Sequence, residues 1–392
     1  MVRRLPCCRP NRRSYASRML RSSILFVMVS GCGGTVAVAP TDGGVDSADP
    51  IDTALADTGT SPPIDTSVLS PPDMGPPPTP GATPPPRPTV MVAGGVTKWF
   101  AIRKLQLGVT NRVTGASDAN AWKQYGFDLD GRTTTAEDSK ISNNSCRRVP
   151  GSPTKVLTDG ELGRDNNFGQ HFMAVVKSLK ADAEDSVTEL IRSGRATLLL
   201  RLDNVGPTDN ASVPGSLFLA GGLGGTPRED GTDKWPIDAS SIDSAKEARA
   251  KFPKGYMAGG VWVSGELGTT SATIPLPSFG ATWMIPMESV VISFDVATGS
   301  MGTIAGATQS TKFVEAITPM MKQWGICPGN ATFDQIAATV MQSSDLVSGA
   351  KSLQDTTREC NALSIGIGFL AVPAAPSTSY VTAPGFPDMC GP

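Results

Sequence analysis

The residues best suited to chemistry are carboxylates that recur at alternate positions in the first third of the chain. Asp128 and Asp130 are separated by one residue and followed by Gly131, and Glu137 comes six positions after that glycine. Alternating carboxylates suit a hard cation such as calcium, and glycine permits the sharp turn of a calcium loop. A complete calcium loop has a further Asp or Asn between its first carboxylate and the glycine, and this middle ligand is missing here. The pattern predicts either a structural calcium site at Asp128, Asp130 and Glu137 or turns in which the aspartates bond their own backbone. A second polar group offers further oxygens: Asp159, Asp165, Asn166 and Asn167.

Residues typical of hydrolytic catalysis are scarce. His171 is the single histidine, and no serine or cysteine motif accompanies it, so we expect a structural, hydrogen-bonded role rather than that of a general base. Ser348 and Lys351 match the Ser-x-x-Lys spacing of penicillin-recognising enzymes, but the partner motifs Ser-Asp-Asn and Lys-Thr-Gly do not occur. We therefore predict that the protein is not an enzyme and needs no cofactor apart from the possible calcium ion.

Aromatic residues offer an alternative function. Exposed rings on a β-sheet face stack on the apolar faces of sugars, and the residues placed for this are Trp122, Tyr125 and Trp262. Packing in the core is the more common fate of large aromatic side chains. A carbohydrate-binding or polysaccharide-cleaving extracellular module is thus the alternative to a non-enzymatic role.

Four cysteines remain in the part of the chain that we expect to be exported. Cys146, Cys327, Cys360 and Cys390 include no Cys-x-x-Cys pair, and an even number outside the cytoplasm predicts two disulfides. Cys327 and Cys360 bracket an expected helix, which favours a bond between them and leaves Cys146 for Cys390. The two other connectivities stay open.

The amino-terminal segment has the features of an export signal. Seven arginines and no acidic residue occur in residues 1–32, and an apolar run covers residues 24–29. That run is too short to cross a bilayer as a helix, which favours a secretory signal. The sequence Val29-Ser30-Gly31-Cys32 that ends it resembles the lipobox of bacterial lipoproteins. The resemblance implies a signal peptide over residues 1–31, acylation of Cys32, and palmitate-type chains that hold the protein in a membrane. An ordinary secretory signal is the alternative.

Composition divides the rest of the chain into two parts. Residues 33–90 contain seven aspartates, 14 prolines and no periodic apolar pattern, so residues 32–90 are predicted to be a lipidated cysteine followed by a disordered tether. Residues 91–392 contain all six tryptophans and can bury a large core. The formal net charge of the whole chain is −2, which gives no sign of a nucleic-acid partner.

The globular part is predicted to be mainly β with inserted helices, either a decorated antiparallel β-sandwich or an α+β fold. Apolar alternation and short apolar runs predict strands at 100–109, 196–202, 216–220, 259–264, 282–286, 290–297 and 364–372. Spacings of three and four residues predict helices at 168–179 and 187–191. Further helices are expected before Pro319 and after a capping box at Thr332–Gln335. Gly366 and Gly368 lie on one face of the last strand, which indicates a crowded sheet face.

Three stretches of the globular part resemble uncharacterised envelope lipoproteins of myxobacterial-type bacteria. They are Gly126–Gly131, Asp159–Gly169 and Cys360–Phe369. Together with the lipobox, the resemblance implies a protein lipid-anchored at the outer membrane or cell surface. We expect a non-enzymatic binding, adhesion or structural role there, with an envelope glycan or protein as the possible partner.

Overall fold

The computed structural model describes residues 82–140, 144–278, 281–350, 352–382 and 388–391. The expected signal peptide, Cys32 and most of the expected tether lie outside these residues. The described part is mainly β with few helices, as predicted. Its strands form one large sheet in the order β12-β4-β3-β2-β1-β11-β10-β9-β7-β6, with β5 paired to β3 and β8 paired to β9.

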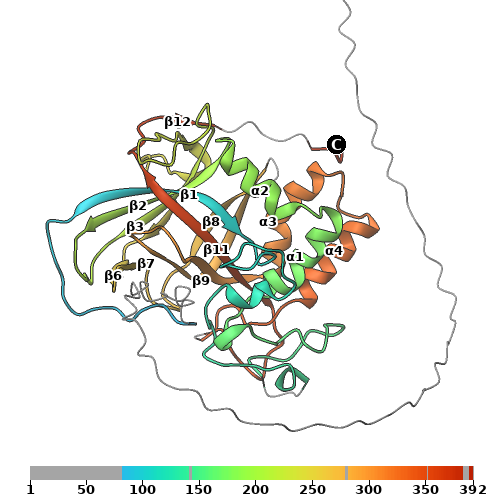
Figure 1. Ribbon diagram of the computed structural model, residues 1–392. Helices are drawn as coiled ribbons and strands as arrows, with labels where there is room; N and C mark the ends of the chain where they lie inside the picture. The colour runs from blue at the N-terminus through green and yellow to red at the C-terminus, as the bar shows by residue number, and fades with distance from the viewer. Residues whose placement is uncertain (1–81, 141–143, 279–280, 351, 383–387, 392) are drawn as a thin grey trace, which may run out of the picture. The chain divides into compact units, whose positions relative to one another are not determined.

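The sheet brings the two ends of the domain together at its centre. β1 (Val96–Gln106) lies between β2 (Thr197–Val205) and β11 (Ala362–Ala374), antiparallel to both. β10 (Gly302–Gln309) and β9 (Ala281–Asp295) continue the sheet beyond β11 (Figure 1). β3 (Gly215–Ala220) extends it on the other side, next to β2. The short outer strands are β4 (Ile237–Asp238), β5 (Ala250–Phe252), β6 (Tyr256–Ala258), β7 (Val261–Val263) and β12 (Tyr380–Val381).

The main core lies between the sheet and the elements that fold over it. β8 (Ala272–Ser278) pairs with β9 and contacts β2, β3 and β5, so that parts of the sheet face one another. Phe294 of β9 occupies the centre, with ring centroids 5.0 Å from Phe100 and 5.8 Å from Phe369. Burial of such side chains contributes about 1.5–3 kcal/mol each.

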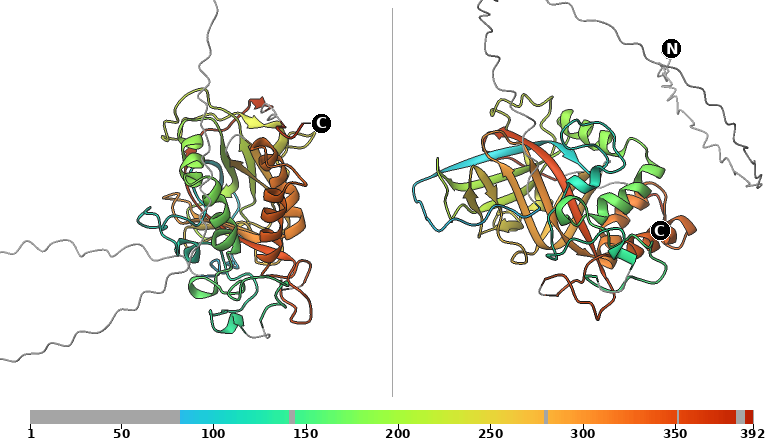
Figure 2. Two further views of the ribbon diagram at one scale, coloured as in Figure 1. Left: turned by 90° about the vertical axis from the view of Figure 1, so that its right-hand side faces the viewer. Right: turned by 60° about the horizontal axis from the view of Figure 1, so that its bottom comes forward.

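Four α-helices gather at one end of the sheet, as two pairs (Figure 2). The first pair is α1 (Met173–Leu179), which continues the π-helical turn η4 (Phe168–Phe172), and α2 (Ala183–Arg192), which packs against β1. α2 ends before Gly194, whose φ of +73° makes it the C-terminal cap that the sequence predicts. The second pair is α3 (Ser310–Gln323), which packs against β9, and α4 (Ala331–Gln342).

Three local expectations need correction. α3 runs through Pro319 without restarting, because Ile317, Met320 and Met321 are all buried and hold the helix against the sheet. α4 is capped by Asn330, whose side chain accepts from the backbone N–H of Phe333, and not by a box at Thr332. The strands expected at 282–286 and 290–297 are one strand, β9, in which Ser289 at φ +55° marks the break in pattern.

The last residues of the expected tether lie against the domain. The guanidinium of Arg87 donates to the carbonyl of Ala211, 2.6 Å away, and forms an ion pair with Glu266 at 3.0 Å. The hydroxyl of Tyr256 donates to the carbonyl of Pro85 at 2.5 Å, and the backbone N–H of Asp128 donates to the carbonyl of Ala82 at 2.8 Å. The packed structure therefore includes residues 82–90, ahead of the expected start at residue 91.

Candidate metal centre

A layer of loops between β1 and α1 crosses β11 and carries the candidate metal ligands. A Cβ atom added to Gly366 would lie 2.7 Å from the backbone nitrogen of Gly126, and one on Gly368 would lie 2.3 Å from the ring of Tyr125. The loop approaches this closely only because both strand residues are glycine, which confirms the crowded face predicted for them. Asn166 fixes the crossing, because its side-chain oxygen accepts from the backbone N–H of Gly366 at 2.9 Å.

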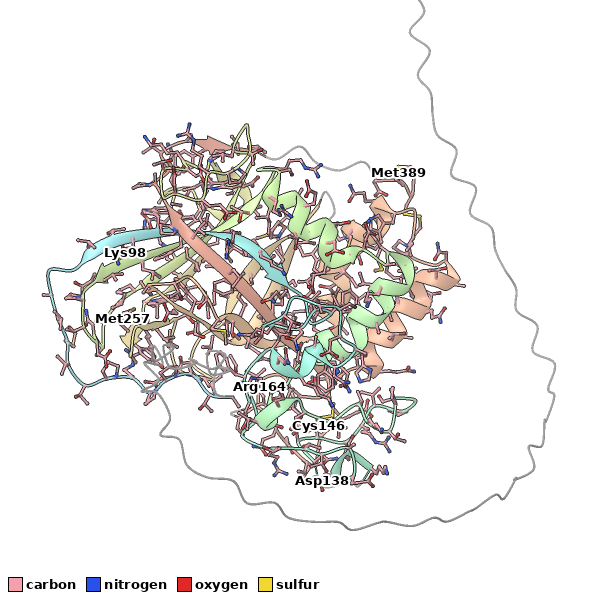
Figure 3. All side chains as sticks on the ribbon, viewed as in Figure 1. Lys98, Asp138, Cys146, Arg164, Met257 and Met389 are labelled. Atoms are coloured by element: carbon pink, nitrogen blue, oxygen red, sulfur yellow. A yellow bond between two sulfur atoms is a disulfide. The ribbon has the colours of Figure 1, made fainter. Side chains whose placement is uncertain are left out.

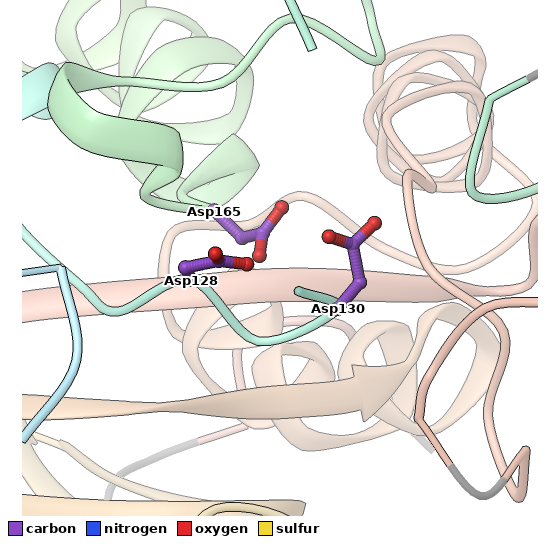
Figure 4. Close-up of side chains that lie close together, drawn as sticks. All are labelled: Asp128, Asp130 and Asp165. Carbon is purple, nitrogen blue, oxygen red and sulfur yellow. The ribbon is translucent and has the colours of Figure 1, made fainter. Parts of the chain in front are cut away.

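The crossing brings three carboxylates together. Asp128, Asp130 and Asp165 each offer one oxygen, and these oxygens all lie within 4.8 Å of one another. Figure 4 shows the three carboxylates turned toward a common space, two from the loop after the crossing and the third from the segment that leads into η4. Asp130 and Asp165 are each 3% exposed.

Both aspartates of the first pair form the turns that the sequence offers as an alternative. Asp128 Oδ1 accepts from the backbone N–H groups of Gly131 at 2.7 Å and Arg132 at 3.1 Å. Asp130 Oδ1 accepts from the same Arg132 N–H at 2.8 Å, and its Oδ2 accepts from the hydroxyl of Ser145. These bonds fix the direction of the carboxylates, as outer hydrogen bonds do for metal ligands.

Asp165 is held by a backbone hydrogen bond from the loop that carries the other two aspartates. Its Oδ2 accepts from the backbone N–H of Leu129 at 2.6 Å. A carboxylate that is only 3% exposed carries a desolvation cost, which raises its pKa in spite of that hydrogen bond.

The carboxylates of the cluster are buried and repel one another, which favours either their protonation or the binding of a cation. Burial raises the pKa of Asp130 to about 6, and the charge of Asp128 adds to the rise. Burial also raises the pKa of Asp159 to about 9 and that of Asp345 to about 7, with Asp130 contributing repulsion to both. The pKa of Asp165 lies well above its ordinary range for the same reasons. A divalent cation would remove this repulsion and hold the carboxylates ionised.

Glu137 is not part of the cluster, so the prediction that it is a calcium ligand is wrong. Its side chain is 81% exposed and forms an ion pair with Lys140 at 2.7 Å. The third carboxylate is Asp165 instead. Asn166 and Asn167 lie next to it, but their amides bond backbone groups of Trp122, Gly169, Gly366, Val156 and Ser343.

Asp345 is the acidic neighbour that sequence reasoning missed. It lies between α4 and β11, and its carboxylate accepts from both the backbone N–H and the hydroxyl of Ser364, at 2.9 and 2.5 Å. Asp159 bonds the backbone N–H of Thr134. No local motif marks Asp345, since 180 residues separate it from Asp165.

The aromatic residues suggested for sugar contact are buried. Trp122 is 5% exposed, while Tyr125 and Trp262 are each 0% exposed. The expected platform is therefore wrong for these three rings, which pack in the core.

The remaining catalytic candidates, His171 and the pair of Ser348 and Lys351, form no catalytic arrangement among the described residues. Burial lowers the pKa of His171, and its Nε2 has no hydrogen-bond partner among the described residues. Ser348 accepts from Gln309, and Lys351 lies outside the described residues.

The described residues form two disulfides, as predicted, but the pairing expected from the sequence is wrong. Cys146 bonds Cys360 and Cys327 bonds Cys390, with Cα–Cα distances of 5.3 and 5.5 Å. The twelve residues of α4 rise about 18 Å, so they carry the chain away from Cys327 instead of returning it. The first bond ties the loop layer to the start of β11, at the end of the molecule where Figure 3 labels Cys146 and Asp138.

The chain was compared with protein-family models, with curated proteins and with solved structures, and none of these matches it. Among the described residues, no helix is both long enough and apolar enough to cross a bilayer.

Proposed function

We propose that the protein is a lipid-anchored protein of the bacterial cell envelope, with a non-enzymatic binding, adhesion or structural role at the outer membrane or cell surface. The observation that carries the proposal is the sequence Val29-Ser30-Gly31-Cys32, directly after an apolar run and directly before a change in composition. Acylation of Cys32 by several chains would make the attachment effectively permanent, since each buried CH₂ contributes about 0.8 kcal/mol.

The disulfides support export of the domain. Both bonds join residues that are far apart in the chain, with separations of 214 and 63 residues. Structural disulfides persist outside the cytoplasm and are rare within it. A tether of Pro-rich sequence between Cys32 and residue 82 would hold the domain away from the lipid headgroups.

The anchor is tested by replacing Cys32 with Ser in the full chain and following membrane fractionation and incorporation of labelled palmitate. We expect palmitate in the wild type, and in the variant either release from membranes or an unprocessed precursor. A wild type without palmitate, or a variant with unchanged membrane partition and processing, contradicts the proposal.

The domain is proposed to hold a structural calcium ion at Asp128, Asp130 and Asp165. Calcium takes six to eight oxygens at 2.3–2.6 Å, so ligands on opposite sides of the ion lie about 5 Å apart. The 4.8 Å limit within the cluster fits one such coordination shell. Further support comes from Asp130 and Asp165, whose buried carboxylates face this space and repel one another when ionised. The ion would fasten the loop layer to the segment before η4.

Glu137 provides a matched control for the calcium proposal. We expect calorimetric titration of the mature protein with calcium to give a Kd on the order of 10⁻⁴ M or lower. Asp165→Asn should weaken binding at least about tenfold, the loss of about 1.4 kcal/mol, whereas Glu137→Gln should leave it unchanged. Loss of binding in Glu137→Gln alone, or equal binding in Asp165→Asn and wild type, contradicts the assignment.

A further inference from the structure

A second polar site lies beside β1, in a cleft of about 420 Å³. Its lining comes from β1, α2, β11 and the loop before β4: Arg103, Lys104, Thr188, Arg192, Glu229 and Leu370. Three of the six side chains are cationic. None of them belongs to the carboxylate cluster, the disulfides or the expected anchor.

A β-bulge places two of the cations side by side. Ile102 of β1 pairs with Ala371 of β11 and Lys104 pairs with Leu370, so Arg103 has no partner of its own. The extra residue breaks the alternation of the strand, and Arg103 and Lys104 both face away from the buried positions Ile102 and Leu105. Bulges commonly redirect side chains next to functional sites.

α2 supplies the third cation from the other wall. Glu184, Thr188 and Arg192 follow one another at intervals of four residues and thus lie along one face of the helix. Glu184 fixes this face to the end of β1, because its carboxylate accepts from the backbone N–H of Leu107 at 2.7 Å. One and two turns later, Thr188 and Arg192 reach the cleft that Arg103 and Lys104 line.

The cations are incompletely neutralised. Glu229 forms an exposed ion pair with Arg103 at 3.5 Å. In the described part of the chain, neither Lys104 nor Arg192 forms an ion pair. The lining therefore carries three positive charges and one negative charge, a net charge of +2.

We propose that this cleft binds a phosphate monoester. A monoester carries a charge of about −1.5 to −2 at neutral pH, which matches the net charge of the lining, whereas a single carboxylate carries only −1. Arginine guanidinium groups present paired N–H donors that suit phosphate oxygens. The volume exceeds that of the phosphate group, and Thr188 and Leu370 offer a polar and an apolar contact for a sugar-sized remainder. The ester is either a free metabolite or the headgroup of a lipid.

The test uses the mature protein and glucose 6-phosphate as the soluble probe, titrated by calorimetry at low salt, with glucose as the uncharged control. Arg192→Gln and Lys104→Gln should each weaken binding about tenfold, the loss of one charge-assisted hydrogen bond. Glu229→Gln should strengthen binding severalfold, because it removes the only negative charge of the lining. Lys98→Gln, an exposed β1 residue labelled in Figure 3, should leave binding unchanged.

The outcomes separate the cleft from general surface charge and separate the two sources of the ester. Binding of glucose 6-phosphate alone supports a soluble ligand. Binding to vesicles that contain phosphatidic acid but not to those of phosphatidylcholine alone, lost in Arg192→Gln, supports a lipid headgroup. Absence of both interactions overturns the proposal. So does equal weakening by Lys98→Gln and Arg192→Gln, or weaker binding in Glu229→Gln. Because all four side chains are solvent-accessible, circular dichroism should be unchanged in every variant.

Discussion

The contact that fixes α2 to β1 is a single buried carboxylate, and its removal gives a sharp test of the packing. Glu184 is 4% exposed and accepts from the backbone N–H groups of Leu107 at 2.7 Å and Val109 at 3.4 Å. Its other oxygen accepts from the hydroxyl of Thr110. The three donors lie just after Gln106, the last residue of β1.

Two substitutions at this position should behave differently. Glu184→Ala leaves the buried N–H of Leu107 and the partly buried N–H of Val109 without their acceptor, at about 1–3 kcal/mol each, while the threonine hydroxyl can rotate toward another acceptor. We expect a loss of about 3 kcal/mol in the free energy of unfolding, or about 5 °C in Tm for a domain of this size. Glu184→Gln keeps an oxygen for the backbone donors and turns an amide N–H toward Thr110, so its loss should stay below about 1 kcal/mol.

The pH dependence distinguishes the charge from the hydrogen bonds. Burial raises the pKa of Glu184 above its ordinary 4.5. Between that value and the raised pKa, the folded protein holds more protons at this site than the unfolded chain, so stability falls as pH rises through this window. Glu184→Gln has no titratable group at this position, so its stability lacks this dependence on pH. The difference in stability between wild type and Glu184→Gln should therefore shift in favour of the variant as pH rises from 4.5, and then level off.

Urea denaturation of the mature protein at several pH values, followed by tryptophan fluorescence, measures both effects. If Glu184→Ala is as stable as wild type, or if Glu184→Gln is as unstable as Glu184→Ala, the hydrogen-bond reasoning is wrong. A pH-independent difference between wild type and Glu184→Gln would show that burial does not raise this pKa.

Three further predictions concern the crossing of β11, the disulfides and the edge of the domain. Gly366→Ala should cost about 3 kcal/mol or more, because its Cβ would lie 2.7 Å from the backbone of Gly126, whereas Gly206→Ala, with open space around it, should be neutral; thermal unfolding compares them. Non-reducing peptide mapping should give Cys146–Cys360 and Cys327–Cys390 peptides; a Cys146–Cys390 peptide would contradict the structure. Limited proteolysis should cut before residue 82 and leave residues 82–90 on the resistant core, because Arg87 is bonded there; a core that begins after residue 90 would contradict that packing.

The sequence predicts the strands that have strong local patterns of apolar residues. It misses strands that form because of the strands packed on either side of them. β1, β2, β3 and β11 are rich in β-branched, leucine and aromatic residues and were expected. β10 was not, because its sequence Gly-Thr-Ile-Ala-Gly-Ala-Thr-Gln mixes three β-branched residues with glycine and alanine and contains no leucine or aromatic residue. It is nevertheless buried at almost every position, between β9 and β11. Its glycines are explained by contact: a Cβ on Gly302 would lie 2.4 Å from the ring of Phe369, which belongs to the adjacent strand.

The candidate metal site shows the same division between local and distant information. Asp128 and Asp130 were predicted because their spacing is visible in four consecutive residues. Glu137 was wrongly added, because spacing along a loop does not reveal where the loop turns next. Asp165 reaches the cluster through the crossing at Gly366, and Asp345 lies near it because Ser364 bonds its carboxylate. Both contacts join segments that are far apart in the sequence, so no local pattern reveals them.

The loop layer is attached to β11 by three independent kinds of contact within a few residues. Cys360 bonds Cys146 just before the strand, Ser364 bonds Asp345 and Asn167, and Gly366 accommodates the backbone of Gly126. A covalent bond over 214 residues would, in the chain-entropy model, contribute about 5 kcal/mol by restricting the unfolded chain. It does nothing to offset the repulsion among buried carboxylates in the folded state. The disulfide lowers the entropy of the unfolded chain, whereas a cation would relieve repulsion in the folded state. We therefore expect calcium to stabilise the protein even when both disulfides are intact.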